Sequence, residues 1–195
     1  MYRSESLAKI RPEGVTALAG LRLGSVIDLR TLTEVQADGT DRLPAGVTPV
    51  PQPVDDTSLF AFIANRAALG AAVRTVANST KPVLFHCSAG KDRTGVVADT
   101  ILRAVGVPAS TAEIDYLLSN QLRAASDQAL RDQLKAAGYM QNPDLLIPLQ
   151  EVRSDYLAAF RDQAVHDYGS FGAFLINGLG LDGSTLTRLR GRLVG

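Results

Sequence analysis

Apolar residues follow two different patterns in the first half of the chain. Residues 12–20 and 58–78 place them at the spacing of one helix face, and residues 95–105 do so again. Residues 25–30 and 83–85 are short apolar runs, each preceded by glycine or proline, which is typical of buried strands. The pattern therefore predicts alternating helices and strands, with a glycine-containing loop between the last strand and the helix that follows it.

Residues 40–56 differ from their neighbours because they combine four prolines with alternating valines. Proline lacks the amide hydrogen that a sheet ladder uses, so this stretch predicts loops around an edge strand. After residue 106 helical patterns dominate, with breaks at Gly138, Gly169 and residues 178–183. The sequence therefore predicts an α/β fold with a mainly parallel central sheet flanked by helices and a helical C-terminal half.

The composition indicates one domain without a general attraction to polyanions. The chain has 195 residues, of which 46% are hydrophobic and 21% charged, so it can bury one core, and we expect a single domain over residues 1–195. Twenty basic residues balance twenty acidic residues, so no global field attracts nucleic acid or an anionic membrane. Any recognition of anions must therefore be local.

No segment resembles a membrane anchor or a secretory signal. No apolar run approaches the roughly eighteen residues of a membrane-spanning helix, and residues 1–10 lack an apolar signal core. We therefore expect no integral membrane association. The expected location is the cytoplasm, or the outside of the cell after secretion by a route without a classical signal peptide.

The single cysteine, Cys87, lies in the segment that carries the chemistry. One cysteine forms neither an intramolecular disulfide nor a cysteine-based metal cluster, so Cys87 is either core packing or a working thiol. Five residues separate it from Arg93, between a predicted strand and a predicted helix. Backbone amides, the positive end of the helix dipole and the guanidinium group can converge there on one phosphate. The predicted phosphate cradle consists of Ser88, Ala89, Gly90, Lys91, Asp92 and Arg93.

The cradle predicts nucleophilic catalysis by Cys87. The positive surroundings favour the thiolate, which attacks phosphorus and forms a cysteinyl-phosphate that water then hydrolyses. Arg93 and the amides hold the equatorial oxygens through both steps, and neither a metal nor another cofactor is needed. His86 either holds the cysteine backbone and favours the thiolate, or packs against a neighbouring carbonyl. Thr94, which follows Arg93 in the motif, is a secondary candidate.

The departing oxygen needs a general acid, and the sequence offers three carboxylate positions. Asp92 lies inside the cradle. Asp28 ends a strand that is expected beside the cradle strand, and its alternative role is an ion pair with Arg30. Asp55 and Asp56 lie on the proline-rich loop, from which they could swing inward or simply start the next helix.

Residues 86–95 resemble the active-site loop of the cysteine phosphatase superfamily. Their ending Gly-Lys-Asp-Arg-Thr-Gly is similar to that of bacterial tyrosine phosphatases of the mycobacterial PtpB type. Three other segments agree with this family in the same order: residues 2–4 with Leu7, residues 26–30 with Glu34, and residues 114–116. The resemblance therefore spans most of the chain, and it is strong at the loop and weak beyond Tyr116. The resemblance implies a phosphatase fold and activity on phosphotyrosine, sometimes extending to phosphoserine, phosphothreonine and phosphoinositides. It also favours Asp92 as the acid.

The resemblance carries two further expectations. Members of the family usually have an additional N-terminal segment before the marker that begins here at Tyr2, so either the chain is truncated or the fold lacks an early strand. The family also often carries a two-helix lid after the marker at residues 114–116. Residues 117–161 are long and helical enough to form one, and the alternative is that they only extend the core.

The expected function is that of a cysteine-dependent protein tyrosine phosphatase with broad or dual specificity. Its expected substrate is a phosphotyrosine protein or peptide. The first alternative is a phosphoinositide phosphatase, because lipid phosphatases also place a lysine beside the glycine of this loop. Lys91 could accordingly bind a second phosphate or an acidic substrate, or it could be a solvated lysine. The second alternative is a non-catalytic phosphate-binding module, which is disfavoured because Cys87 and Arg93 are both present.

Overall fold

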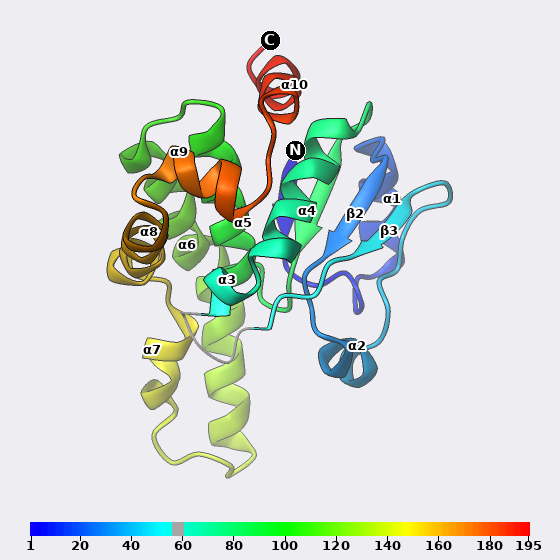
Figure 1. Cartoon of the computed structure of the whole chain (residues 1–195). Coiled ribbons are helices and arrows are strands. Elements are labelled where there is room, and N and C mark those ends of the chain that lie inside the picture. Colours follow the sequence, from blue (N-terminus) through cyan, green and yellow to red (C-terminus); the bar gives the residue numbers. More distant parts are fainter. Residues whose placement is uncertain (56–60) are drawn as a thin grey trace.

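A four-stranded parallel sheet forms the centre of the molecule (Figure 1). The computed structural model describes residues 1–55 and 61–195. The strands are β1 (Tyr2–Ser4), β2 (Ser25–Asp28), β3 (Thr48–Pro51) and β4 (Val83–His86), arranged in the order β1-β4-β2-β3. All neighbouring strands pair in parallel, so their carboxyl ends meet at one edge of the sheet. The predicted α/β fold with a mainly parallel sheet is therefore confirmed.

Helices cover the two faces of the sheet unequally. Ile27 and Phe85 point to one face, where α4 (Arg66–Asn78) and α5 (Asp92–Ala104) complete the larger core. Val26 and Leu84 point to the other face, which α1 (Pro12–Gly20) covers with a smaller cluster. Figure 1 shows α4 in front of the sheet and α1 behind it. Successive strand residues thus reach opposite cores, as the two-residue repeat of a strand requires.

Prolines terminate the sheet at β3. The amides of Thr48 and Gln52 donate to the carbonyls of Gly24 and Asp28, at 3.0 and 2.8 Å, so these donors face β2. The residues that alternate with them on the outer edge are Pro49, Pro51 and Pro53. Because proline has no amide hydrogen, the outer edge lacks the donors that a further strand would need. The expected edge strand is therefore present.

The helices in the first half differ from their predicted bounds in two places. The helix expected over residues 58–78 divides at Asn65 into α3 (Ala61–Ala64) and α4, and its first residues, 58–60, lie outside the described residues. Helix α5 begins at Asp92, three residues before the apolar helical pattern that starts at residue 95. The earlier start brings the loop after β4 directly onto the amino end of a helix.

The C-terminal half is helical, as expected. It contains the long α6 (Ala109–Ala136), a short 3-10 turn (Pro143–Leu146), α7 (Ile147–Gln150), α8 (Ser154–Tyr168), α9 (Phe171–Ala173), a π-helical turn (Phe174–Gly178) and α10 (Gly183–Leu193). Helix α6 packs on α5, and its C-terminal part extends beyond the carboxyl edge of the sheet together with α7 (Figure 1). Within the described part of the chain, no helix combines the length and apolar character needed to cross a membrane.

Candidate active site

The loop after β4 places Cys87 at the carboxyl edge of the sheet. The register aligns Ser4 of β1 and Asp28 of β2 with the last residue of β4, so Cys87 follows between two strand ends. Its side chain is only 2% exposed, and the amide of Gly90 donates to its Sγ atom at 3.3 Å. Gly90 has a φ of 69°, and a Cβ atom there would lie 2.4 Å from the Ser4 carbonyl oxygen. The turn that aims this amide at the sulfur therefore requires glycine.

Arg93 lies in the first turn of α5 and turns its guanidinium toward Glu34. Its Nη1 and Nη2 atoms each lie 2.6 Å from one oxygen of the Glu34 carboxylate, which makes a bidentate ion pair. Nη1 also reaches the carbonyls of Leu29 and Val54, at 3.3 and 3.4 Å. These contacts fix the plane of the guanidinium.

Glu34 connects three parts of the site. It belongs to α2 (Leu32–Asp38) and forms a capping box with Thr31, whose amide donates to Oε2 at 2.8 Å. The same carboxylate accepts a hydrogen bond from the Ser88 hydroxyl, in addition to the two from Arg93. The Arg93 hydrogen bonds, with those of Ser88 and Thr31, hold the pKa of Glu34 well below its usual range despite partial burial. The carboxylate is therefore a permanent negative brace between α2, the cradle loop and α5.

His86 supplies a second brace from behind the loop. Its ring is fully buried, with Nδ1 at 3.0 Å from the Cys87 carbonyl oxygen and Nε2 at 2.8 Å from Oδ2 of Asp41. Both partners are hydrogen-bond acceptors, so both bonds form only when the ring carries two protons. The ring thus holds the carbonyl of the residue that carries the thiol and connects it to Asp41. The contact with this carbonyl agrees with both interpretations of His86, and the bond to Asp41 adds a partner that was not foreseen.

Asp28 takes the role of an ion-pair partner. Arg30, whose side chain is fully buried, lies 2.7 Å from Asp28 Oδ2 and 2.9 Å from Asp41 Oδ1 through its Nη2 atom. Within residues 1–55 and 61–195, the carboxylates of Asp28 and Asp41 with His86 form the one group of potential metal ligands close enough to share an ion. Arg30 already supplies positive charge to both carboxylates. The group is therefore explained as a buried ion-pair network that supports the loop.

Asp92 and Lys91 lie at the mouth of the cradle. Oδ2 of Asp92 is 2.9 Å from Nζ of Lys91, and the Asp92 side chain is 38% exposed. The Lys91 ammonium also donates to the Leu149 carbonyl at 2.8 Å, beyond the end of the cradle loop. Tyr116 lies close by, where burial, followed by the charge of Asp92, raises the pKa of its phenol. Asp92 is thus the accessible carboxylate within the predicted cradle.

The remaining candidates lie farther from this arrangement. Thr94 is fully buried, and within the described part of the chain its hydroxyl has no hydrogen-bond partner. Asp55 is exposed and its carbonyl accepts from the side chain of Asn65 at 3.0 Å. Asp56 lies outside the described residues. The fold therefore brings Cys87 and the six cradle residues together and leaves Thr94 in the core.

Segments that are distant in the sequence meet around the cradle. Arg3 of β1 pairs with Asp115 of α6 at 3.4 Å. Gly95 of α5 packs so closely on Tyr116 that a Cβ atom would lie 2.3 Å from its ring. From α6, Arg123 donates to the Ala89 carbonyl at 2.9 Å. The residues quoted for the family resemblance thus share one neighbourhood in space.

Sequence reasoning noted Glu34 only as part of a family marker and did not consider Asp41. A local signal existed for Glu34, because Thr31 and Glu34 have the spacing of a capping box immediately after a predicted strand. No local signal existed for its bond with Arg93, which joins residues 59 positions apart. Asp41 lies on an irregular loop, and its link to His86 depends entirely on the tertiary fold.

Comparison with known proteins gives consistent results. The sequence model described as "Tyrosine phosphatase family" matches residues 1–195. The chain is 29% identical over 251 residues to the triple specificity protein phosphatase PtpB of Mycobacterium tuberculosis, covering 100% of this chain and 91% of that protein. It is 37% identical over 126 residues to a Cupriavidus necator protein that carries a tyrosine-protein phosphatase name, covering 65% of this chain and 44% of that protein. A Nostoc commune tyrosine-protein phosphatase matches at 46% identity over 46 residues, which is 24% of this chain and 16% of that protein.

Replacing Glu34 by glutamine should destabilise the fold in a pH-dependent way. Loss of charge-assisted bonds to Arg93 and Ser88 should lower the free energy of unfolding by about 2 kcal/mol at pH 7. Because the pKa of Glu34 is lowered in the folded state, its contribution is complete above the unfolded-state pKa of about 4.3 and falls as the pH drops toward the folded-state value. Denaturant titrations from pH 8 to pH 3 measure the difference between wild type and variant.

The expected difference is constant from pH 8 to about pH 5 and shrinks below about pH 4. The matched control is Glu5→Gln, which removes an exposed ion pair with Arg123 and should change the free energy of unfolding by less than about 0.5 kcal/mol. A Glu34→Gln difference as small as that of the control would show that the carboxylate does not brace the site.

Proposed function

The chain belongs to the tyrosine phosphatase family over its whole length, and from this premise we propose that Cys87 is the nucleophile with which it hydrolyses phosphate monoesters. The chain is a cysteine-dependent tyrosine phosphatase, which is a phosphoric monoester hydrolase. The observation that carries the residue assignment is a sulfur that accepts a hydrogen bond from a loop amide, in the same loop that leads into the braced arginine. Gly90 approaches the Cys87 sulfur, and Glu34 holds the Arg93 guanidinium by two bonds.

In the first step the Cys87 thiolate attacks the phosphorus atom of the substrate. The new S–P bond forms as the P–O bond to the leaving group breaks, and the bonding electrons depart with the ester oxygen. The loop amides and Arg93 donate hydrogen bonds to the three equatorial oxygens, whose charge they stabilise in a buried setting. The amide of Gly90 donates to the sulfur, and amides and cations around a cysteine favour the thiolate over the thiol.

In the second step water hydrolyses the cysteinyl-phosphate. The oxygen of water forms a bond to phosphorus, the S–P bond breaks, and the thiolate is regenerated with release of inorganic phosphate. The same amides and Arg93 hold the phosphoryl oxygens, because both steps pass through similar geometry at phosphorus. Asp92 is our candidate for the acid that protonates the leaving oxygen and then for the base that receives a proton from water. Its exposed position at the mouth of the cradle supports this role, although the ion pair with Lys91 favours the carboxylate over the acid.

We propose phosphotyrosine in a protein or peptide as the substrate, with broader specificity in addition. The relative from Mycobacterium tuberculosis is named a triple specificity protein phosphatase, which supports activity beyond phosphotyrosine. Phosphoinositides are the second candidate class, and the cation that favours them is Lys91 at the mouth of the cradle. A non-catalytic phosphate-binding role is disfavoured by the presence of both Cys87 and Arg93.

We also propose that residues 1–195 act as one domain in which residues 117–161 cover the cradle as a lid. This stretch contacts the cradle loop at two points. Arg123 binds the Ala89 carbonyl from α6, and the Leu149 carbonyl binds Lys91 from the segment near α7. Both contacts are single hydrogen bonds, which suits a segment that must open for substrate.

Replacing Cys87 by serine should abolish turnover while substrate binding persists. An alcohol is a poor nucleophile at neutral pH, whereas the amides and Arg93 that bind the phosphate remain. Turnover of p-nitrophenyl phosphate measures the first effect, and binding of a non-hydrolysed phosphotyrosine peptide measures the second. Wild-type activity should persist in EDTA and be inhibited by vanadate. Retained turnover in the Cys87→Ser variant, or activity that chelation removes and a divalent ion restores, would contradict the proposal.

Replacing Asp92 by asparagine should slow poor leaving groups much more than good ones. A nitrophenolate departs without protonation, whereas an alkoxide needs an acid, and general acid catalysis typically supplies about 10²–10⁴-fold in rate. Rates for a series of aryl and alkyl phosphates should therefore depend more steeply on the leaving group in Asp92→Asn than in wild type. The matched variants are Asp28→Asn and Asp55→Asn. An Asp92→Asn variant that slows every ester equally would make Asp92 a structural brace, and a steeper dependence in a matched variant would identify the acid there.

A further inference from the structure

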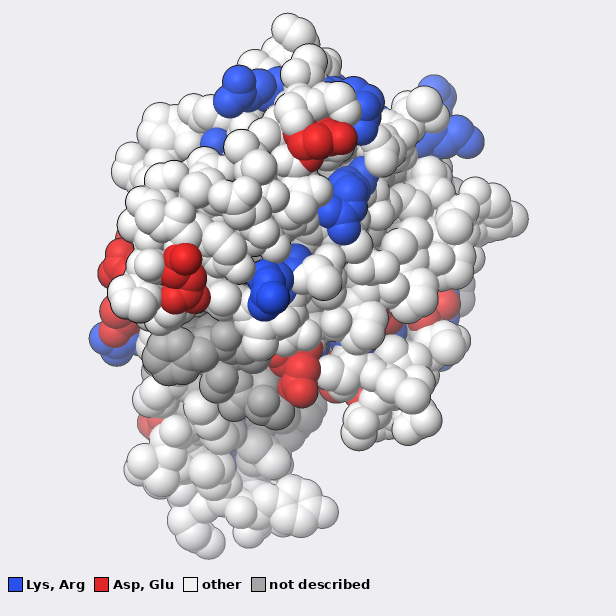
Figure 2. Space-filling model, viewed as in Figure 1, with Lys and Arg blue, Asp and Glu red and all other residues white. Residues whose placement is uncertain are grey.

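Positive charge is segregated within this electrically neutral chain. Residues 57–91 contain no aspartate or glutamate, and residues 168–195 contain only Asp182. These two stretches supply α4 and α10, which pack against each other. The one acid among them accepts the hydrogen bond from the Thr185 amide that caps α10, and this bond lowers the pKa of Asp182 to about 2. In the upper half of Figure 2, over α4 and α10, basic side chains outnumber acidic ones.

The basic residues of this region also differ from the others in lacking acidic partners. Most cations elsewhere in the described part of the chain form ion pairs, as do Arg3, Arg30, Arg93 and Arg161. Within the described residues, no carboxylate lies within ion-pair distance of the cations around α4 and α10, which are Arg22, Arg66, Arg74, Lys81, Arg188, Arg190 and Arg192. Their positive charge is therefore available to an external anion.

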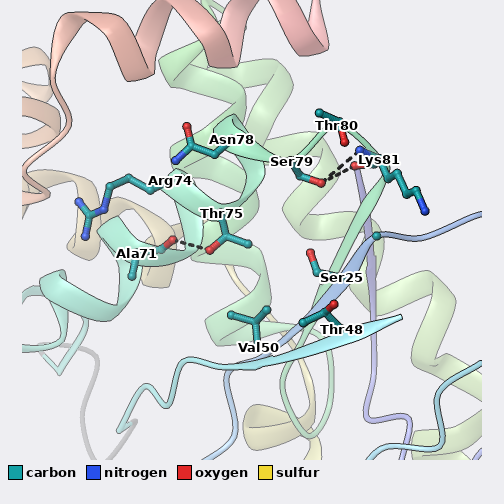
Figure 3. Close-up of a pocket in the computed structure, with 11 residues that line it drawn as sticks. Ser25, Thr48, Val50, Ala71, Arg74, Thr75, Asn78, Ser79, Thr80 and Lys81 are labelled. Atoms are coloured by element: carbon teal, nitrogen blue, oxygen red, sulfur yellow. Dashed lines mark hydrogen bonds between the residues drawn. The ribbon is translucent and has the colours of Figure 1, made fainter. Parts of the chain in front are cut away.

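Two adjoining hollows lie among these cations. The first, of about 710 Å³, lies between α4 and the strands β2 and β3, with Arg74 and Lys81 at its opposite ends (Figure 3). The second, of about 520 Å³, continues from Thr80 and Lys81 to Arg22. Among the residues that the structure describes, none that lines either hollow is acidic. Thr80 and Lys81 line both hollows, which together form one groove. Arg74 and Arg22 lie toward its two ends, and Lys81 lies between them.

Neighbouring side chains reinforce this arrangement. Arg188 of α10 donates to Oδ1 of Asn78 at 3.0 Å, which leaves the Asn78 amide hydrogens for a ligand. Arg192 donates to the Lys81 carbonyl, so a fourth guanidinium lies beside the rim. Arg22 has a φ of 52° at the end of α1, a conformation for which glycine is the usual choice. Arg22 therefore places a long cationic side chain at a position whose backbone conformation is unfavourable for residues other than glycine.

We propose that this groove is a docking site for an acidic segment of the phosphoprotein substrate. The groove is shallow and open, which suits an extended peptide better than a small molecule, because small-molecule sites enclose most of their ligand. The described residues that line it include no aromatic side chain, so they offer no stacking surface of the kind that single-stranded nucleic acid uses. The choice of substrate rests on the proposed function, whereas the charge and shape of the groove do not.

The position of the groove favours a flexible protein segment over a lipid surface. Gly24 and Lys81 precede β2 and β4, so the groove lies at the amino edge of the sheet, whereas Cys87 lies at the carboxyl edge. A bilayer bound at the groove would face away from the catalytic loop. The four-residue strands are about 13 Å long, so a linker of ten residues, which can extend to about 33 Å, can reach from the groove to the cradle.

Two synthetic substrates test the proposal. Each carries the same phosphotyrosine segment and a ten-residue glycine-serine linker, followed by six alternating Asp and Glu residues in one and by Asn and Gln in the other. At about 20 mM salt, wild type should cleave the acidic-tailed peptide with a kcat/KM about tenfold higher, chiefly through KM. The advantage should fall to less than about twofold at 0.5 M salt, where exposed charges are screened.

The decisive variant is Arg74→Glu combined with Lys81→Glu, which reverses two cations of the groove. It should lose the preference for the acidic tail, while its turnover of p-nitrophenyl phosphate remains as in wild type. The assays are run well below its thermal transition, which loss of the Arg74 hydrogen bond to the Leu179 carbonyl should lower. The control combines Arg11→Glu with Lys135→Glu, two exposed cations outside the groove, and should keep the preference. Loss of the preference in both double variants would reveal a general effect of net charge and overturn the proposal.

Direct binding separates this proposal from the proposed function. The acidic tail alone, labelled for fluorescence anisotropy, should bind wild type and Cys87→Ser equally and should not bind the Arg74→Glu, Lys81→Glu variant. Failure of the tail to bind, in a protein that still hydrolyses p-nitrophenyl phosphate, would overturn the docking site and leave the phosphatase assignment intact. Binding of duplex DNA or phosphatidylserine vesicles that the variant loses, without any binding of the tail, would also overturn it.

Discussion

The bidentate pair between Arg93 and Glu34 is the interaction on which the site depends. The Arg93 guanidinium is buried in the first turn of α5, where a cation is costly unless it is paired. Glu34 supplies the counter-charge, fixes the plane of the group and draws in the Ser88 hydroxyl. Because the same carboxylate completes the capping box of α2, the geometry of the cradle is tied to the start of that helix.

A parallel sheet makes this arrangement possible. The strands β1, β2 and β4 all end at one edge, so the loop after β4 is flanked by Ser4, Asp28 and the residues that follow them. Arg30, Asp41 and His86 form a buried network directly behind that loop. The opposite edge of the sheet carries cations beside α4 and α10 that have no carboxylate partner among the described residues, so the two ends of the molecule differ in chemistry although the chain as a whole is neutral. The cradle can therefore bind the phosphate group while the groove at the other edge binds the protein that carries this phosphate.

The sequence allowed the local parts of the site to be predicted. A strand at 83–85, a loop with Gly90 and a helix beginning near Arg93 follow from residues that are adjacent in the chain. The prolines at alternating positions after residue 48 likewise identified an edge strand. In each case a single short segment contains both the signal and the structure that it predicts.

The partners of those local parts could not be predicted. The bonds of Glu34 to Arg93 and of Asp41 to His86 join segments that become neighbours only when β2 inserts beside β4. The length of α6 as one helix was not predicted either, because its exposed C-terminal part has little apolar periodicity to connect it with the part that packs on α5. Long-range charge pairing and the continuation of a helix beyond the core depend on tertiary structure, for which one sequence carries no direct signal.

The central claim is that phosphate passes through a covalent bond to Cys87. The most direct test is rapid acid quenching of wild type during turnover of an aryl phosphate, followed by mass spectrometry of the peptide that contains residues 86–95. The account predicts the added mass of one phosphoryl group on Cys87 during turnover and its disappearance when substrate is exhausted. A phosphoryl group on another residue, or turnover at an undiminished rate with no phosphorylated enzyme at any quench time, would contradict it.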